Sequence, residues 1–436
     1  MSARTSPAGH LRRLPFGIGT VTIILIAVMV GSVGAVLAFG GSDEPATFDN
    51  GRLRPYPGEP AVAWSVSSDN LPGYRSDAGI DVVDSWQDRW LLSYPSGLGR
   101  AFLLVKRTSG EHLWSQPVVV GLGGCAITDD GRVGCAIKLG GVPDGFYLID
   151  DDGTPTDASS LDDTAQVVGV GRDFLRIDQA GYRVAMHDAG GREIWSRTFA
   201  AAAKASWRHE GVLTIQTVDG ARFIVNPTTG RDRLACTQCT ITVFATGITV
   251  QYNESGRERV ATHAIENGAV DERPTSQSPS LRVLAGPSTL PVLTGTGVGQ
   301  IDATQGRYEI RDPAQSGALW QITDSELSKA NTRPCGEQVA LALKDRSRVF
   351  YRLADGKRLG TLGPPALDNP DANIDQLSCV GSSESTLVFA NNNQITAYDT
   401  THGDIAWSRS VIGPTTVTDG FIVVHEGTSM TVLAPN

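Results

Sequence analysis

The sequence lacks the short motifs that mark most enzymes and nucleotide-binding proteins. No serine is flanked as in G-x-S-x-G, and neither a P-loop nor a dinucleotide fingerprint occurs. Adjacent cysteines are absent, and Cys236–Cys239 (CTQC) is followed by Thr240 instead of histidine, which excludes a c-type haem site. We therefore favour a non-catalytic protein and keep an enzyme as the alternative.

The chain also has no excess of basic residues. Its 37 lysines and arginines are outnumbered by 47 acidic residues, so the net charge is −10. The first 40 residues contain three arginines and no acid, so the rest is more acidic still. Because phosphate binding needs a positive surface, nucleic acid is excluded as a partner.

Long hydrophobic runs are missing except at residues 16–39, where 24 residues carry no charge. Such a run can span about 30 Å of hydrocarbon. Arg12 and Arg13 precede it, which predicts a cytoplasmic tail at residues 1–15 and an extracytoplasmic body at a bacterial-type plasma membrane. A signal peptide cleaved after Ala38 is the alternative, although the run exceeds the usual length of such a segment. Residues 40–60 contain four prolines and predict a spacer between membrane and body.

No long amphipathic helix is evident, and the remainder reads as short strands and turns. The clearest unit is Gln394–Ser408 (QITAYDTTHGDIAWS), a strand, a polar turn closed by glycine, and a second strand with tryptophan. Near-copies are Phe102–Ser115, Tyr182–Ser196 and Tyr308–Trp320.

Turn glycines recur through the whole chain at intervals of 37–49 residues. They are Gly110, Gly153, Gly190, Gly230, Gly268, Gly317, Gly356 and Gly403. An all-strand repeat of this period is typical of four-stranded propeller blades. We expect the tryptophans of these units to fill the gaps between neighbouring blades. These residues are Trp64, Trp114, Trp195, Trp320 and Trp407.

The two ends of the repeat region complement each other. Ala61–Ser65 is a strand with Trp64 and no preceding hairpin, while Thr418–Pro435 is a hairpin with no tryptophan strand after it. Pairing them completes one blade and removes two exposed edges. Eight turns plus this blade make nine, but the units of Gly153 and Gly268 are weak. We predict a propeller of about eight blades over residues 61–436, with seven to nine allowed.

The pattern A-x-D-x-x-x-G-x-x-x-W, clearest at Ala397–Trp407, resembles the quinoprotein (PQQ-like) β-propeller repeat. The layout of the chain ends is similar to the propeller lipoproteins of outer-membrane assembly. The resemblance implies an all-β propeller that is either a scaffold or a dehydrogenase holding PQQ and Ca²⁺. Because the cysteine pair that clamps the quinone is missing, no cofactor is predicted, and a PQQ-dependent oxidoreductase stays an alternative.

Six cysteines in an exported domain predict disulfides. Cys125 and Cys135 flank a hairpin turn, Cys236 and Cys239 could close a tight loop or act as a redox dithiol, and Cys335 and Cys379 could join two blades. Six cysteines allow 15 connectivities, so the pairing stays open. No metal site is predicted, because Asp150–Gly153 lacks the spaced acids of a calcium loop.

These features together predict a membrane-anchored extracytoplasmic propeller that acts as a binding or scaffold module in the cell envelope. Its partners would be the membrane, through residues 16–39, and a protein or glycan. An extracytoplasmic ligand sensor is a further alternative.

Overall fold

The computed structural model describes residues 48–75, 78–160, 163–208, 210–295, 306–327, 332–364 and 373–436. Thr47–Asn436 form one compact unit, separate from Met1–Ala46. The predicted tail 1–15, the predicted membrane helix 16–39 and the start of the predicted spacer lie outside the described residues. Across the described ranges, no helix is both long and apolar enough to cross a membrane.

Nine antiparallel sheets, which we call blades 1 to 9, make up the described part of Thr47–Asn436. Blades 1 to 3 are β2 (Asp81–Trp86), β3 (Arg89–Ser96), β4 (Gly99–Lys106), β5 (Val118–Gly121); β6 (Gly124–Ile127), β7 (Val133–Ile137), β8 (Gly145–Ile149), β9 (Pro155–Ser160); and β10 (Thr164–Val170), β11 (Asp173–Asp178), β12 (Arg183–His187), β13 (Glu193–Thr198).

Blades 4 to 6 are β14 (Ala203–Arg208), β15 (Val212–Thr217), β16 (Ala221–Val225), β17 (Asp232–Thr237); β18 (Thr240–Phe244), β19 (Gly247–Glu254), β20 (Arg257–Glu266), β21 (Ala269–Val270), with β22 (Ser276–Pro279) also paired to β20; and β23 (Leu281–Val283), β24 (Val292–Gly295), β25 (Gly306–Arg311), β26 (Ala318–Asp324).

Blades 7 to 9 are β27 (Arg333–Cys335), β28 (Gln338–Ala342), β29 (Arg348–Arg352), β30 (Arg358–Leu362); β31 (Ser378–Ser383), β32 (Thr386–Ala390), β33 (Gln394–Asp399), β34 (Asp404–Ser410); and β35 (Thr415–Thr418), β36 (Phe421–Glu426), β37 (Ser429–Leu433), β1 (Val62–Ser67). Helical structure in the described ranges consists of η3 (Ser68–Asn70) and η5 (Ile374–Gln376).

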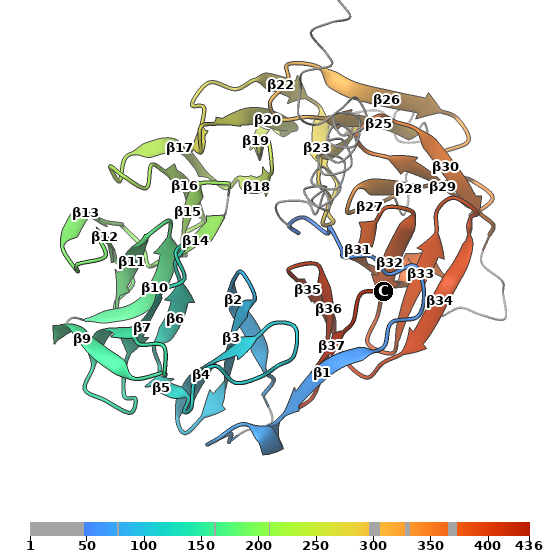
Figure 1. The fold of residues 1–436 in the computed structure, drawn as a ribbon. Helices are drawn as coiled ribbons and strands as arrows, with labels where there is room; N and C mark the ends of the chain where they lie inside the picture. The colour runs from blue at the N-terminus through green and yellow to red at the C-terminus, as the bar shows by residue number, and fades with distance from the viewer. Residues whose placement is uncertain are drawn as a thin grey trace, which may run out of the picture. The chain divides into compact units, whose positions relative to one another are not determined.

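The blades follow one another around a centre, with the first strand of each blade innermost and the fourth on the rim (Figure 1). Second strands such as β28 and β32 are buried along their whole length, because neighbouring blades cover both of their faces. Rim strands such as β13 instead have mostly exposed residues. The chain is a β-propeller.

Because the strands of a blade alternate in direction, its turns divide between two faces. The turns between first and second strands, and between third and fourth strands, lie on one face, which we call the AB face. The turns between second and third strands, and the links between blades, lie on the other, which we call the BC face.

Nine sheets are present in the described chain, one more than the predicted eight and at the upper end of the range of seven to nine. The two units that looked weak, around Gly153 and Gly268, are blades 2 and 5. Their rim strands β9 and β21 carry no tryptophan, and β21 has two residues. Strand pairing uses backbone groups and does not require that side chain, so a weak match to the repeat did not mean a missing blade.

The ends of the chain close the ring as expected. Strand β1 pairs antiparallel with β37, with Trp64 opposite Val432 and Val66 opposite Met430. The N-terminal strand β1 is therefore the rim strand of blade 9. It pairs with the edge of β37 that the C-terminal hairpin alone would leave exposed.

The tryptophans of the rim strands reach into the next blade. Trp64 donates its indole N–H to the Arg107 carbonyl at 2.7 Å, Trp195 to Pro227 at 2.7 Å, and Trp320 to Leu353 at 2.7 Å. Each accepting carbonyl lies three residues before a turn glycine of that blade. A Cβ added to the backbone at Gly110, Gly230 or Gly356 would lie 2.6–2.8 Å from the indole ring. The glycine is needed because the indole occupies the place of a side chain.

Trp407, in blade 8, finds a different partner. Blade 9 has no turn between its third and fourth strands, since these are β37 and β1 from opposite ends of the chain. Trp407 instead donates to the Tyr56 carbonyl at 2.8 Å. Tyr56 is fully buried, accepts from the Ile422 amide at 3.1 Å and donates to the Leu433 carbonyl at 3.0 Å.

Residues 48–60 are therefore part of the folded body, which corrects the prediction that residues 40–60 are a spacer, for the portion described. Leu53 and Tyr56 pack in the core between blades 8 and 9. The Leu53 amide donates to the Ser382 carbonyl at 2.8 Å, and the Arg54 amide donates to Gly420 at 3.0 Å. The prolines in this segment indicated an extended chain, but they gave no sign that it packs between blades 8 and 9.

All six cysteines are paired. Cys125 joins Cys135 across the β6–β7 hairpin, Cys236 joins Cys239 between blades 4 and 5, and Cys335 joins Cys379 between blades 7 and 8. These are the three pairs that the sequence suggested while the connectivity was left open. A redox dithiol at Cys236 and Cys239 is not indicated, because both stand at strand ends and not at the start of a helix.

Replacing Gly110 by alanine tests the contact between blades 9 and 1. The new methyl group would meet the Trp64 ring, so we expect a loss of about 2–4 kcal/mol in the free energy of unfolding, measured in urea. Gly256 is the matched control, because its φ of +79° is also left-handed but no atom lies within 4 Å of its Cβ position. Gly256→Ala should lose only the backbone penalty of about 1–2 kcal/mol. Equal losses would contradict the contact.

Tyr56→Phe tests whether the N-terminal segment is held against blades 8 and 9. Loss of the hydroxyl leaves the buried Ile422 amide and Leu433 carbonyl without this partner, so unfolding should become easier by about 2 kcal/mol or more. Tyr182→Phe, on an exposed ring, should change it by less than about 0.5 kcal/mol. A Tyr56→Phe variant as stable as its Tyr182→Phe counterpart would mean that residues 48–60 are not held in solution.

Peptide mapping under non-reducing conditions tests the disulfides. Digestion of the alkylated, unreduced protein should yield three linked pairs, 125–135, 236–239 and 335–379, and no alkylated cysteine. The last pair joins neighbouring blades, so Cys335→Ser with Cys379→Ser should lower the free energy of unfolding by about 2–4 kcal/mol. Any crossed pair or free thiol would contradict the pairing.

Candidate functional site

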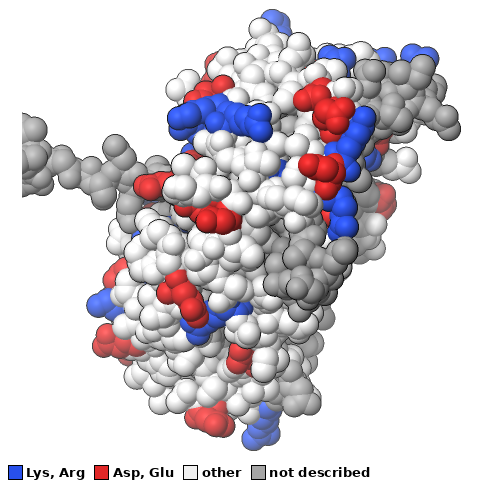
Figure 2. All heavy atoms as spheres, turned by 90° about the vertical axis from the view of Figure 1, so that its right-hand side faces the viewer, with Lys and Arg blue, Asp and Glu red and all other residues white. Residues whose placement is uncertain are grey.

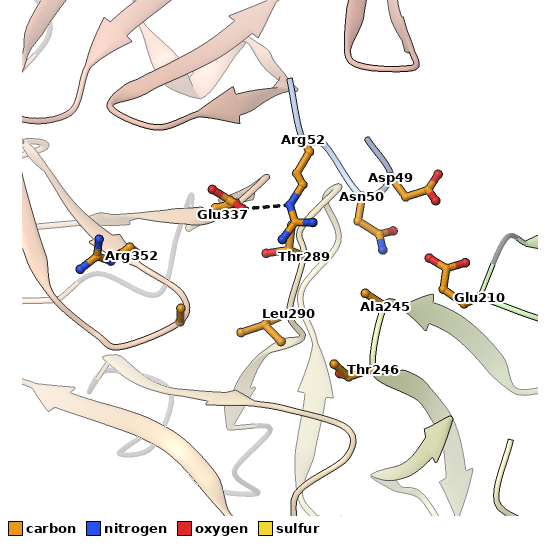
Figure 3. A pocket seen from close by; sticks show the side chains of 11 residues that line it. Asp49, Asn50, Arg52, Glu210, Ala245, Thr246, Thr289, Leu290, Glu337 and Arg352 are labelled. Carbon is orange, nitrogen blue, oxygen red and sulfur yellow. Dashed lines mark hydrogen bonds and ion pairs between the residues drawn. The ribbon is translucent and has the colours of Figure 1, made fainter. Parts of the chain in front are cut away.

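A cavity of about 240 Å³ opens at the AB face near the centre of the ring (Figure 3). Turns of four successive blades and the N-terminal segment form its wall. The lining residues are Asp49, Asn50, Arg52, Glu210, Ala245, Thr246, Thr289, Leu290, Glu337, Arg352 and Ala354.

The fold places these side chains through the connections that it repeats in each blade. Glu210 stands between β14 and β15, Thr246 between β18 and β19, Thr289 between β23 and β24, and Glu337 between β27 and β28. Since all four are first-to-second strand connections, they meet at the AB face around the centre.

The N-terminal segment supplies the remaining wall. Arg52 forms a parallel bridge with Ser382 of β31. Gly51, with a φ of +82°, passes so close to blade 6 that a Cβ there would lie 2.9 Å from the Pro287 carbonyl oxygen. The N-terminal segment is anchored on blades 6 to 8. It places Asp49 and Asn50 beside the first-to-second strand connections of blades 4 and 5.

The basic side chains of the cavity are already paired. Arg52 Nε lies 2.9 Å from Glu337 Oε1. Arg352 Nε lies 2.9 Å from Asp355 Oδ1, and the hydrogen bond from Arg352 lowers the pKa of Asp355 to about 2. Both guanidinium charges are thus offset by a carboxylate beside them.

The carboxylates on the other side of the cavity have fewer hydrogen-bond and ion-pair partners. Asp49 Oδ1 lies 3.6 Å from Arg208 Nη1, which is a long contact. Asp49 Oδ2 and Glu210 Oε2 are buried, and neither has a hydrogen-bond partner among the described residues. Figure 3 shows Asp49, Asn50 and Glu210 on one side of the cavity and Arg52, Glu337 and Arg352 on the other.

The residues that the sequence singled out lie elsewhere. The six cysteines and the five tryptophans are absent from the lining of the cavity. Asp150–Gly153 forms an exposed turn in which Asp152 Oδ1 accepts from the Thr154 amide at 2.9 Å. Among the described residues, no group of three or more metal-ligating side chains is present.

A second feature, on the BC face, was missed in the sequence. Leu98, Leu122 and Leu139 are 92%, 63% and 65% exposed. They stand in glycine-rich connections of blades 1 and 2, namely 97–99 (GLG), 121–124 (GLGG) and 138–141 (KLGG), which we call the leucine turns. The recurrence of leucine beside glycine was the signal that could have revealed them.

The leucine turns lie against one another through their backbones. A Cβ at Gly99 would lie 2.0 Å from the Gly121 carbonyl oxygen, and one at Gly121 would lie 2.1 Å from that of Lys138. The Leu122 amide donates to the Lys138 carbonyl at 2.9 Å. The glycines allow this approach, and each of the three turns leaves a leucine side chain exposed to solvent.

Charge does not single out a further site on the side of the molecule seen in Figure 2. Basic and acidic side chains are interspersed there, and neither sign forms a continuous patch.

Comparison with known proteins supports no assignment beyond the fold. No family model and no curated protein matches the chain. Among solved structures, the chain is similar to BamB from Moraxella catarrhalis (14% identity, 86% of this chain and 97% of that chain, TM-score 0.39). It is also similar to the computationally designed protein Ika8 (12% identity, 85% of this chain and 99% of that chain, TM-score 0.42). A third similar structure is the Dos1 propeller (9% identity, 86% of this chain and 95% of that chain, TM-score 0.36). The quinoprotein repeat therefore stays a resemblance.

Proposed function

We propose that this protein is a non-catalytic binding and scaffold module of the cell envelope, held at the plasma membrane by residues 16–39 and binding a protein partner through the leucine turns. The observation that carries the proposal is that three adjoining turns of blades 1 and 2 each carry an exposed leucine. Single exposed apolar residues are common, but three on adjoining turns favour a surface that a partner covers.

The charges beside the leucine turns favour a protein over an anionic lipid surface. Lys138 Nζ is paired with Asp144 at 2.8 Å, and Arg100 Nη2 is paired with Asp81 at 2.8 Å. Attraction to an anionic membrane needs basic side chains that are free to face it. An apolar centre with a polar rim is instead the usual arrangement of a protein–protein interface.

The three disulfides fit an exported location, because disulfides persist in oxidising compartments. This agrees with the orientation that Arg12 and Arg13 predict for the membrane segment. The location and the anchor are part of the proposal and follow from the sequence.

Site-specific photocrosslinking in the native cells tests the leucine surface. A photoreactive residue at position 98 of the full chain should form a discrete adduct with one protein, whereas one at exposed position 111, on the AB face, should not. The identified partner should then bind the purified propeller directly, and Leu122→Ser with Leu139→Ser should weaken that binding about tenfold or more.

Val218→Ser is the matched control. Val218 is also on the BC face and 74% exposed, but it lies alone in blade 4, so its replacement should leave the affinity unchanged. Adducts that are equal at positions 98 and 111, or binding that the leucine replacements leave intact, would overturn the proposed surface.

A further inference from the structure

We propose that the cavity at the AB face binds a cationic group, a primary ammonium or a guanidinium, between Asp49 and Glu210. This inference rests on the proposed role as a binding module and adds a second, chemically different site on the opposite face.

The first argument is the balance of charge. Each arginine in the wall has a carboxylate beside it, Glu337 for Arg52 and Asp355 for Arg352. Arg208 offsets Asp49 at 3.6 Å. Glu210 is left with no cation within ion-pair distance in the described part of the chain. The cavity therefore carries one carboxylate charge in excess, located on the side where Asp49 and Glu210 lie (Figure 3).

The second argument is hydrogen-bond satisfaction. Asp49 Oδ2 and Glu210 Oε2 are buried without a partner among the residues that the structure describes, and an ionised carboxylate can only accept hydrogen bonds. Burying such an oxygen unpaired is unfavourable, so a donor bound beside it would restore the lost hydrogen bond.

The two threonines of the cavity point to the same kind of ligand. Thr246 Oγ1 donates to Asp312 Oδ1 at 2.6 Å, and Thr289 Oγ1 donates to the Gly336 carbonyl at 3.3 Å. Since a hydroxyl has one proton, both can offer the cavity only their lone pairs. Glu210 and the two threonine hydroxyls thus present acceptors, which suit a ligand that donates.

The remaining wall suits the carbon stem of such a group. Leu290, Ala245 and Ala354 supply apolar surface in the wall. The volume of about 240 Å³ lies below the range of about 300–1,000 Å³ that is common for larger organic ligands. It fits a small amine or a single lysine or arginine side chain that enters from the open side.

Calorimetric titration of the purified propeller, residues 41–436, tests the site with agmatine, n-butylamine and n-butyrate as probes. Agmatine and butylamine should bind, with affinity falling as salt is added, and butyrate should not. Glu210→Gln and, separately, Asp49→Asn should weaken agmatine binding about tenfold or more, as expected when a charge-assisted hydrogen bond is lost.

Glu384→Gln is the matched control, because Glu384 is an exposed carboxylate in the same kind of turn in blade 8, outside the cavity. It should leave binding unchanged. Thermal unfolding of each variant would show that it is folded. Agmatine binding that Glu210→Gln and Asp49→Asn leave intact, equal binding of butyrate, or no binding of either amine would overturn the inference.

A tripeptide, acetyl-Gly-Arg-Gly-amide, distinguishes the two sources of the cation. Tighter binding of the peptide than of agmatine would assign the site to a side chain of a protein partner, and the reverse order would assign it to a free amine. Leu98→Ser should leave these titrations unchanged. The proposed partner binding at the leucine turns and the proposed cation binding in the cavity can therefore be refuted separately.

Discussion

The contact that recurs between blades is the packing of a tryptophan from one blade against a turn glycine of the next, as at Gly110, Gly230 and Gly356. A blade by itself exposes both faces of its sheet, so its strands are buried only when neighbours stack on it. The indole supplies a large apolar surface, and its N–H fixes the register by donating to one backbone carbonyl, as Trp64 does to Arg107. Removing a buried ring of this size typically costs about 3–5 kcal/mol, which is a large part of the stability of a protein.

Where the repeat is interrupted, the chain substitutes another element. At blade 9 the ring joins strands from the two ends of the sequence, so the turn that should receive Trp407 does not exist. Tyr56 fills this position, with its carbonyl bound to Trp407 and its hydroxyl bound to both β36 and β37. The N-terminal segment is thus required by the same geometry that requires a turn glycine elsewhere. The interface between blades 9 and 1 is also held by Trp90, whose indole N–H donates to the Asp419 carboxylate at 2.7 Å.

The parts of the structure that repeat could be predicted, and those that do not repeat could not. The tryptophans between blades follow from the period, whereas blades 2 and 5 keep the backbone pairing but match the repeat weakly, so the count of eight was one short. Tyr56 carries no signal, because its partners Ile422 and Leu433 are more than 360 residues away. Neither candidate site lies in a recognisable motif. The cavity combines several distant segments, and the glycines beside Leu98 are also found in ordinary tight turns. What distinguishes the leucine turns is their contact in space, which depends on how blade 1 stacks on blade 2.

The antiparallel blades also determine how the two sites relate. Every strand joins a turn on the AB face to a turn on the BC face, so the cavity and the leucine turns lie at opposite ends of the strands. A partner on the leucine turns leaves the cavity open, and a group in the cavity leaves the leucines exposed. Since the N-terminal segment both lines the cavity at Asp49 and fills the junction at Tyr56, the cavity shares its wall with the element that completes the ring. Binding at Asp49 should therefore stabilise the closed ring, because a ligand that prefers the folded segment adds its binding free energy to folding.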